Sequence, residues 1–235
     1  MTQVLLVDDA SALAELFAEA ITTRLGYDVA VAVSLRDVED TVTGLVDLDL
    51  ALIDLSFPQE PGSGIDALDT VHRLRPDALL AIITQGDDWV AETLRDAWEL
   101  LPVATVISKS APLAYQLDAI ALVVNTGAAP VDPAIQPMLP ATRSPLRTPS
   151  RFQRLVQHAG HVKLWSALIA APDPSYREIA DRSGLKLNTV KNYRAQLLPE
   201  LSVHGLDDPS LREMQEFARR CRVFFNPYLN GQGIS

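Results

Sequence analysis

The sequence predicts a doubly wound α/β domain followed by an all-α domain. Short apolar runs alternate with helical patterns in the first half, and two short amphipathic helical patterns joined by a glycine-containing turn lie in the second. Repeated strand–helix units imply a parallel sheet covered by helices on both faces. A proline-rich stretch lies between the halves, so we predict domains over residues 1–126 and 151–235 joined by a linker over 127–150.

Five short apolar runs predict the strands of the sheet, at residues 3–7, 29–33, 48–53, 79–83 and 103–107. Helical patterns follow them, near residues 11–25, 35–45, 65–75, 88–100 and 112–124. In the first helix, apolar residues at helical spacing predict a core-facing stripe made of Leu13, Leu16, Phe17, Ala20 and Ile21.

Composition and charge limit the possible classes of protein. The chain has 235 residues, and a hydrophobic fraction of 48% is enough for folded cores. A single cysteine, Cys221, excludes an internal disulfide framework. With no membrane-length apolar run and no leader pattern, we expect a cytoplasmic protein without a membrane partner.

Charge is distributed unevenly along the chain. Residues 1–143 hold 7 Lys+Arg and 22 Asp+Glu, a net charge of −15, whereas residues 144–235 hold 13 and 8, a net charge of +5. The asymmetry indicates two functions on one chain, and the basic half is suited to meeting a polyanion.

Charged side chains follow three of the predicted strands. Asp8 and Asp9 follow the first strand, Asp54 ends the third and Lys109 follows the fifth. Carboxyl ends of parallel strands meet at one edge of an open sheet, where such sheets bind ligands. Three converging carboxylates favour a hard cation, meaning Mg²⁺. Taken singly, each residue is more often a turn residue, a helix cap or a surface charge.

With a cation present, a carboxylate oxygen of Asp54 can attack a phosphoryl donor and form an acyl phosphate. The metal and Lys109 would neutralise charge on the phosphoryl oxygens. Thr84 ends the fourth strand, and its hydroxyl can hydrogen-bond a phosphoryl oxygen. We expect self-phosphorylation chemistry here rather than an enzyme with turnover.

The ordered set of strand-end motifs resembles the receiver domain of two-component response regulators, which has a flavodoxin-like fold. The resemblance covers about residues 1–125 and is carried by residues 4–9 (VLLVDD), 54–58 (DLSFP) with Gly62, Thr84 and residues 107–109 (ISK). It implies that Asp54 accepts phosphate from a sensor histidine kinase.

The same resemblance implies a role for each neighbouring residue. Asp9 and Asp54 would bind Mg²⁺ together with the backbone carbonyl of Ser56, and Asp8 would assist. Thr84 and Lys109 would contact the phosphoryl group. Two positions depart from the family pattern: Gln85 replaces a small residue, and Val106 replaces the aromatic residue that swings inward on activation. The usual threonine–aromatic switch is therefore incomplete.

The second half contains a helix-turn-helix pattern. Ser175 and Glu178 form a capping-box pattern that predicts a helix over residues 176–183, and Gly184 supplies its stop. Asn188 is expected to cap a second helix, which we expect to end or kink near Pro199. Two short helices joined by such a turn form a helix-turn-helix.

The second helix of this pair has one apolar and one polar face. Val190, Tyr193 and Leu197 share the face expected to meet the core. The outward face of such a helix enters the major groove of DNA. The candidate DNA-contacting residues are Lys186, Asn188, Thr189, Lys191, Asn192, Arg194 and Ala195. Asn192 suits an adenine edge, and Arg194 suits a phosphate.

Residues 178–180 (EIA), Gly184, residues 189–192 (TVKN) and residues 201–203 (LSV) resemble the LuxR-type helix-turn-helix of the NarL/FixJ class of response regulators. The resemblance implies that Lys191, Asn192 and Ala195 read bases and that Thr189 contacts phosphate. Downstream, a last helix is expected to carry an apolar stripe: Leu211, Met214, Ala218, Cys221 and Phe225. This stripe either forms a dimer contact, as in the family, or packs on its own domain.

The sequence therefore predicts a phosphorylation-dependent transcription regulator. Its expected partners are a sensor histidine kinase, double-stranded promoter DNA and a second copy of the chain, since helix-turn-helix proteins usually read symmetric sites. One alternative is an atypical receiver that signals independently of phosphorylation through protein–protein contacts. Another is a small hydrolase, because acid clusters on α/β sheets also serve phosphatases.

Overall fold

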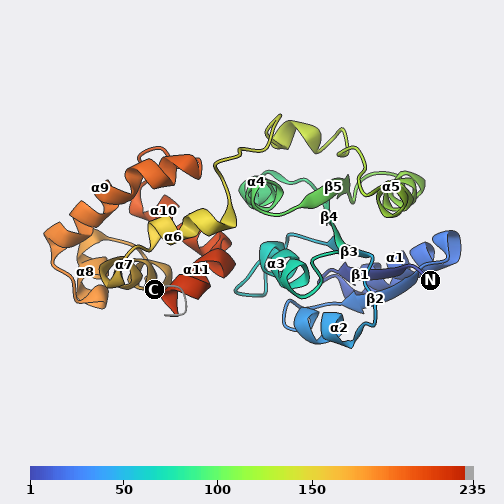
Figure 1. Cartoon of the computed structure of the whole chain (residues 1–235), viewed down its shortest axis with the longest axis horizontal. Helices are drawn as coiled ribbons and strands as arrows, with labels where there is room; N and C mark the ends of the chain where they lie inside the picture. Colours follow the sequence, from blue (N-terminus) through green and yellow to red (C-terminus); the bar gives the residue numbers. More distant parts are fainter. Residues whose placement is uncertain (231–235) are drawn as a thin grey trace. The chain divides into compact units, whose positions relative to one another are not determined.

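The computed structural model describes residues 1–230 and divides the chain into two compact units (Figure 1). The first unit comprises Met1–Arg143, and the second begins at Ser144. No helix within the described residues combines the length and the apolar character needed to cross a membrane.

The first unit contains a five-stranded parallel sheet in the order β2-β1-β3-β4-β5. Its strands are β1 (Gln3–Val7), β2 (Asp28–Ala32), β3 (Leu50–Ile53), β4 (Leu79–Thr84) and β5 (Val103–Ser108). The three central strands are buried on both faces, which is why their sequences read as continuous apolar runs. The predicted doubly wound α/β fold is confirmed.

Helices cover both faces of this sheet (Figure 1). They are α1 (Ser11–Leu25), α2 (Val38–Gly44), α3 (Gly64–Leu74), α4 (Ala91–Leu100) after the short η1 (Asp88–Val90), and α5 (Leu113–Thr126). Figure 1 shows α1 and α5 on one face and α2, α3 and α4 on the other. Apolar side chains of α1 and α5 share one buried cluster with the strands.

The core-facing stripe predicted for α1 was wrong in part. Ala14, Ala18 and Ile21 are buried, whereas Leu13 and Leu16 are 67% and 63% exposed. The buried face is rotated from the predicted one, because small alanines rather than leucines allow α1 to lie close to the sheet. The two leucines consequently form part of an open apolar surface on α1.

The proline-rich segment differs from the linker expected over residues 127–150. Residues up to Arg143 belong to the first unit. The amide of Asp132 donates to the carbonyl of Val106 at 2.9 Å, so the segment pairs with the outer edge of β5. Ile135 is fully buried. Proline removes amide donors but leaves neighbouring residues able to pack, and composition alone does not reveal that packing.

In the described residues of the second unit, all regular secondary structure is helical (Figure 1). Its α-helices are α6 (Phe152–Leu155), α7 (Ala159–Ala170), α8 (Tyr176–Ser183), α9 (Leu187–Val203), α10 (Leu211–Arg220) and α11 (Arg222–Leu229). Phe152 lies at the centre of the core, with ring contacts to Phe217, Phe224 and Phe225 at 5.1 to 5.7 Å. Trp165 packs against Phe225 at 4.8 Å.

The apolar stripe predicted for a single last helix spans two helices, α10 and α11. All five residues of that stripe are buried: Leu211, Met214, Ala218, Cys221 and Phe225. Ser210 caps α10, in a complete capping box with Glu213. Of the two roles left open by the sequence, the structure favours packing on its own domain.

Candidate functional site

The order of the strands brings the predicted acidic residues together. Asp8 follows β1 and Asp54 follows β3, and these strands are direct neighbours with Val7 opposite Ile53. Both carboxylates therefore leave the sheet at the same edge, where Asp8 is 6% and Asp54 4% exposed. An Asp8 oxygen accepts the amide of Ala10 at 3.0 Å, which fixes the loop after β1.

Lys109 joins these two carboxylates from the end of β5. Its Nζ lies 2.6 Å from Asp8 Oδ2 and 2.8 Å from Asp54 Oδ2. Burial opposes the charged form of Lys109, but attraction and hydrogen bonds from Asp54 and Asp8 outweigh it and raise the pKa of the ammonium. Lys109 is therefore a permanent cation at the site.

Burial has the opposite consequence for the acceptor carboxylate. It raises the pKa of Asp54 above the usual value, because desolvation outweighs the stabilising charge of Lys109. The negative charge of Asp8 acts in the same direction as burial. A further cation at this edge would stabilise the ionised Asp54, which is the form that can act as a nucleophile.

The carboxylates are arranged suitably for such a cation. One oxygen from each of Asp8, Asp9 and Asp54 lies within 4.8 Å of the others, and Asp9 is exposed to solvent. Hard oxygen ligands with room for retained water match the preference of Mg²⁺. The structure thus brings together four residues that the sequence predicted for this site: Asp8, Asp9, Asp54 and Lys109. The Ser56 carbonyl as a ligand stays a prediction.

Thr84 lies at the same edge of the sheet. It ends β4 opposite Ser108, and its carbonyl accepts the amide of Lys109 at 2.8 Å. Its hydroxyl accepts the amide of Gly86 at 3.3 Å and is buried within its own loop. The neighbouring Gln85 is exposed, and its side-chain oxygen accepts the hydroxyl of Ser110 at 3.0 Å. Gln85 therefore connects the two loops that flank the site.

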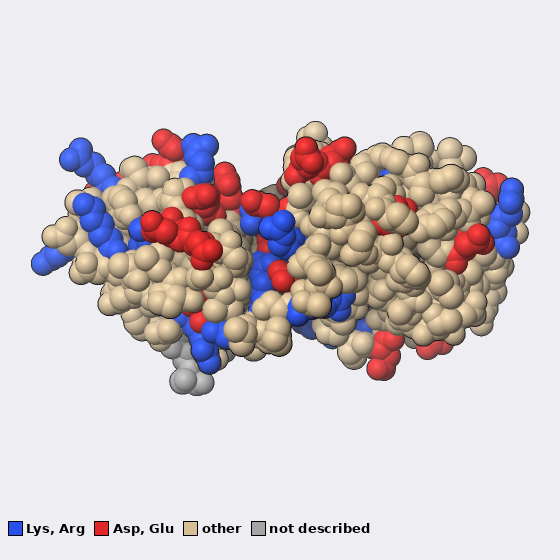
Figure 2. All heavy atoms as spheres, turned by 90° about the horizontal axis from the view of Figure 1, so that it is seen from above, with Lys and Arg blue, Asp and Glu red and all other residues tan. Residues whose placement is uncertain are grey.

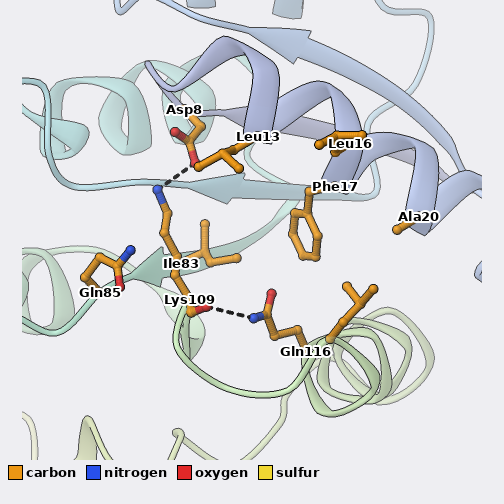
Figure 3. Close-up of a pocket in the computed structure, with 10 residues that line it drawn as sticks. Asp8, Leu13, Leu16, Phe17, Ala20, Ile83, Gln85, Lys109 and Gln116 are labelled. Atoms are coloured by element: carbon orange, nitrogen blue, oxygen red, sulfur yellow. Dashed lines mark hydrogen bonds and ion pairs between the residues drawn. The ribbon is translucent and has the colours of Figure 1, made fainter.

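An apolar cavity of about 310 Å³ opens beside Lys109 (Figure 3). Its lining comes from α1, α5 and the strand ends, and includes Leu13, Leu16 and Phe17. Gln116 on α5 is buried, and its amide group donates to the carbonyls of Lys109 and Ala111 at 3.1 and 2.7 Å. It fixes the loop that presents Lys109. No motif in the sequence distinguished this glutamine from a surface residue.

The helix pair α8–α9 presents most of the predicted polar face. Lys186, Asn188, Lys191, Asn192 and Ala195 are exposed. Val190 and Leu197 are buried beneath them, as predicted. Figure 2 shows basic side chains projecting from the end of the second unit that α8 and α9 form. Thr189 is half-buried at the start of α9.

Three expectations for α9 need correction. Lys186, not Asn188, is its N-cap, because the helix begins at Leu187. The helix does not end near Pro199, because Pro199 lies inside α9, which continues to Val203. Arg194 is not a free phosphate contact: its guanidinium donates to the carbonyl of Pro209 at 2.7 and 3.0 Å, and it pairs with Asp208 at 2.6 Å. This pairing anchors the chain after α9.

Only one of the two hydrogen bonds of the capping box predicted for α8 is present. The hydroxyl of Ser175 accepts the amide of Glu178 at 3.2 Å. The Glu178 carboxylate turns to Arg182 instead, at 2.8 Å. One hydrogen bond to an otherwise free amide is still sufficient to define the start of the helix.

Tyr193 on α9 packs against a histidine pair at the start of α7. The rings of His158 and His161 lie 3.9 Å apart, and that of Tyr193 lies about 5 Å from both. A Cβ at Gly160 would lie 2.4 Å from the tyrosine oxygen, so glycine permits this close approach. Burial, helped by the neighbouring His158, lowers the pKa of His161 to about 4.

The buried His161 predicts acid sensitivity. The ordinary pKa of a histidine is 6.5, so between pH 6.5 and pH 4 the unfolded chain binds a proton at His161 that the folded chain excludes. The free energy of unfolding is therefore highest above pH 6.5 and decreases as the pH falls through this window. In His161→Leu this acid-induced decrease in the free energy of unfolding is expected to be smaller by about 3 kcal/mol. Urea unfolding of both proteins at pH 7 and 4.5 measures it, and equal pH dependence would contradict the assignment.

Comparisons with known proteins support the fold of the first unit. No family model matches the sequence, and no curated protein matches it. A LuxR-family two-component response regulator from Aurantimonas sp. SI85-9A1 matches with a TM-score of 0.50 at 23% identity, over 59% of this chain and 95% of that chain. This likeness shows that the first unit has the receiver fold.

Two other solved structures are similar over about half of the chain. A CheY-like receiver domain protein from Methanospirillum hungatei JF-1 has a TM-score of 0.45 at 21% identity, over 53% of this chain and 94% of that chain. The response regulator TrrA from Thermotoga maritima, solved in complex with Mg(2+)-BeF, has a TM-score of 0.43 at 20% identity, over 52% of this chain and 97% of that chain.

Proposed function

We propose that the protein is a response regulator in which Asp54 accepts a phosphoryl group and the helical unit binds DNA. The observation that carries the first part is the joint position of Asp54, Asp8 and Lys109 at one sheet edge, with Nζ–Oδ2 distances of 2.6 and 2.8 Å. A buried carboxylate beside a fixed cation and a second acid is suited to forming an acyl phosphate.

Each side chain at the site would have a separate task in phosphorylation. Asp54 supplies the attacking oxygen, and its Oδ1 is oriented by the amide of Leu55 at 2.7 Å. Lys109 balances the negative charge of the phosphoryl oxygens. Asp8, Asp9 and Asp54, with the Ser56 carbonyl, would hold Mg²⁺. When bound, the metal supplies charge neutralisation at the donor phosphate.

The phosphoryl donor would be a sensor histidine kinase, which is the partner that the receiver fold suggests. Incubation of the full chain with acetyl phosphate and Mg²⁺, followed by mass spectrometry of the intact protein, tests the acceptor chemistry without the kinase. The expected result is the addition of one phosphoryl group that requires Mg²⁺. An unchanged mass under these conditions would contradict the proposal.

DNA binding is supported by the polar face of α9 and by the charge of the second half. Asn192 and Lys191 are exposed on α9, and Lys186 is exposed just before it. Residues 144–235 carry a net charge of +5, which favours contact with a phosphate backbone. Helix-turn-helix proteins usually bind symmetric DNA sites as two copies, so a homodimer is part of the proposal.

Removal of the reading side chains should weaken DNA binding strongly. For the double variant Lys191→Ala/Asn192→Ala we expect a loss of about 2–5 kcal/mol, because a base contact and a charged contact disappear together. Gel shifts with a duplex selected by the wild-type protein from a random pool, with acetyl phosphate and Mg²⁺ present, measure the effect.

Arg222→Ala is the matched control for this experiment. Arg222 is an exposed cation of the same unit, but it lies on α11 and outside the helix pair α8–α9. Its removal lowers the charge by one and should change affinity little. Equal losses in both proteins would point to non-specific attraction, and failure of the wild-type protein to select any duplex would favour a partner-binding role for the helical unit.

A further inference from the structure

We propose that residues 128–143, here called the strap, are a relay that detaches from the first unit when Asp54 is phosphorylated. This inference rests on the proposed function of Asp54 and adds an output to it. The strap belongs to the compact first unit although the sequence predicted a linker there. Its contacts lie along β5 and beside the loop that follows Thr84.

The first set of contacts holds the strap to the edge strand. The amide of Asp132 donates to the carbonyl of Val106 at 2.9 Å, and the buried Thr105 hydroxyl donates to the carbonyl of Pro130 at 2.9 Å. Val106 occupies the position at which the sequence lacks the usual aromatic switch residue. In this chain the backbone of that position binds the strap instead.

The second set of contacts holds the far end of the strap. Arg143 donates to the carbonyl of Val103, and its guanidinium lies 4.0 Å from the ring centroid of Trp98 on α4. Leu139, which lies between Ile135 and Arg143 in the sequence, is also buried. The strap is therefore attached at both ends and in its middle, and each attachment is small.

Ile135 connects the strap to the phosphorylation site. It is 1% exposed, and a Cβ built on Gly86 would lie 2.4 Å from its Cδ1, so the side chain rests directly on the Gly86 backbone. Gly86 has a φ of +80°, which a residue with a side chain rarely adopts. Glycine at this position thus provides both the turn and the space for Ile135.

The Thr84 hydroxyl links this contact to Asp54. It now accepts the amide of Gly86 at 3.3 Å. A phosphoryl group on Asp54 offers this hydroxyl an acceptor oxygen, and a hydroxyl that turns to donate to it leaves the Gly86 amide. The loop is then free to shift against Ile135. Movement at Thr84 would therefore reach the strap without an aromatic side chain.

The balance of forces makes such release feasible. Only two buried apolar side chains and a few hydrogen bonds attach the sixteen residues of the strap. On release these residues would regain conformational entropy, which offsets the loss of those contacts. The strap forms the last part of the first unit, which ends at Arg143, and the second unit begins at Ser144. Release would add a tether of roughly 50 Å at about 3.1 Å per residue. The helical unit would then be held by a longer tether.

Hydrogen exchange of the full chain tests the relay. With Mg²⁺ and beryllofluoride as a phosphoryl mimic, peptides covering residues 128–143 should exchange at least about tenfold faster than in the untreated protein. The Asp54→Asn protein should show no such change. Binding of the mimic is followed separately by its ¹⁹F resonances. Bound mimic with an unchanged strap overturns the relay and leaves the acceptor function intact, whereas no binding contradicts both.

A substitution in the strap tests the same coupling from the other side. Ile135→Ala should speed exchange in residues 128–143 and also in residues 84–87 without any phosphoryl mimic, because the two segments support each other. Leu122→Ala is the control, since Leu122 is exposed on α5. A variant with a loosened strap but an unchanged loop over residues 84–87 would show that Ile135 only anchors the strap, and would overturn the proposal.

Discussion

Asp54→Asn is expected to abolish phosphorylation of the chain. The amide is nearly the same size as the carboxylate but carries no charge and is a poor nucleophile, so the acyl phosphate cannot form. It also removes one of the two carboxylates that hold Lys109, at 2.8 Å. Mass spectrometry after acetyl phosphate and Mg²⁺ should show the mass of the unmodified variant alone.

Asp47→Asn is the matched control for that substitution. Asp47 is an exposed aspartate just before β3, so the same chemical change occurs on the same stretch of chain but away from the strand end. This variant should gain one phosphoryl group as the wild-type protein does. Phosphorylation of Asp54→Asn to the wild-type extent would place the acceptor at another residue and refute the assignment.

Trp165→Ala is expected to unfold the second unit while the first remains folded. The indole is fully buried, packs on Phe225 and donates to the carbonyl of Leu155 at 2.7 Å. Truncation of a buried tryptophan costs about 3–5 kcal/mol, which is a large part of the stability of a small domain. The loss of the hydrogen bond also leaves a buried carbonyl without its partner.

Two controls separate this effect from general damage. Trp165→Phe keeps a ring in the core and should lose clearly less stability. Trp89→Ala removes a tryptophan that is 64% exposed, and should change stability by less than about 0.5 kcal/mol. Urea unfolding measures the stability of each variant. Mg²⁺-dependent phosphorylation is a second readout, which reports whether the first unit is folded. Loss of phosphorylation in Trp165→Ala would contradict the independence of the two units.

The sequence predicted the site of the first unit well because its signals are local. A charged residue directly after an apolar run marks a strand end, and parallel strands bring such ends to one edge of the sheet. Asp8, Asp54 and Lys109 meet for this reason. Gln116 and Ile135 could not be found in the same way, because their roles depend on contacts across the fold that no spacing along the chain encodes.

The faces of the helices were harder to predict than their positions. Leu13 and Leu16 are apolar but exposed, since alanines allow α1 to pack closely on the sheet. Arg194 has the spacing of an outward cation on α9, yet the chain after the helix folds back and takes its guanidinium. In both cases tertiary packing, which periodicity does not contain, decides where the side chain lies.

The pairing of the strap with β5 has a consequence for solubility. An open parallel sheet ends in strands with unpaired amides and carbonyls, and such edges recruit strands from other molecules. Here Asp132 pairs with one side of β5, while Pro130 and Pro133 beside it have no amide hydrogen to offer a further strand. The proline-rich segment thus protects the β5 edge of the sheet from edge-to-edge aggregation. Any signal that detaches this segment would expose the unpaired backbone groups of β5 for as long as the signal lasts.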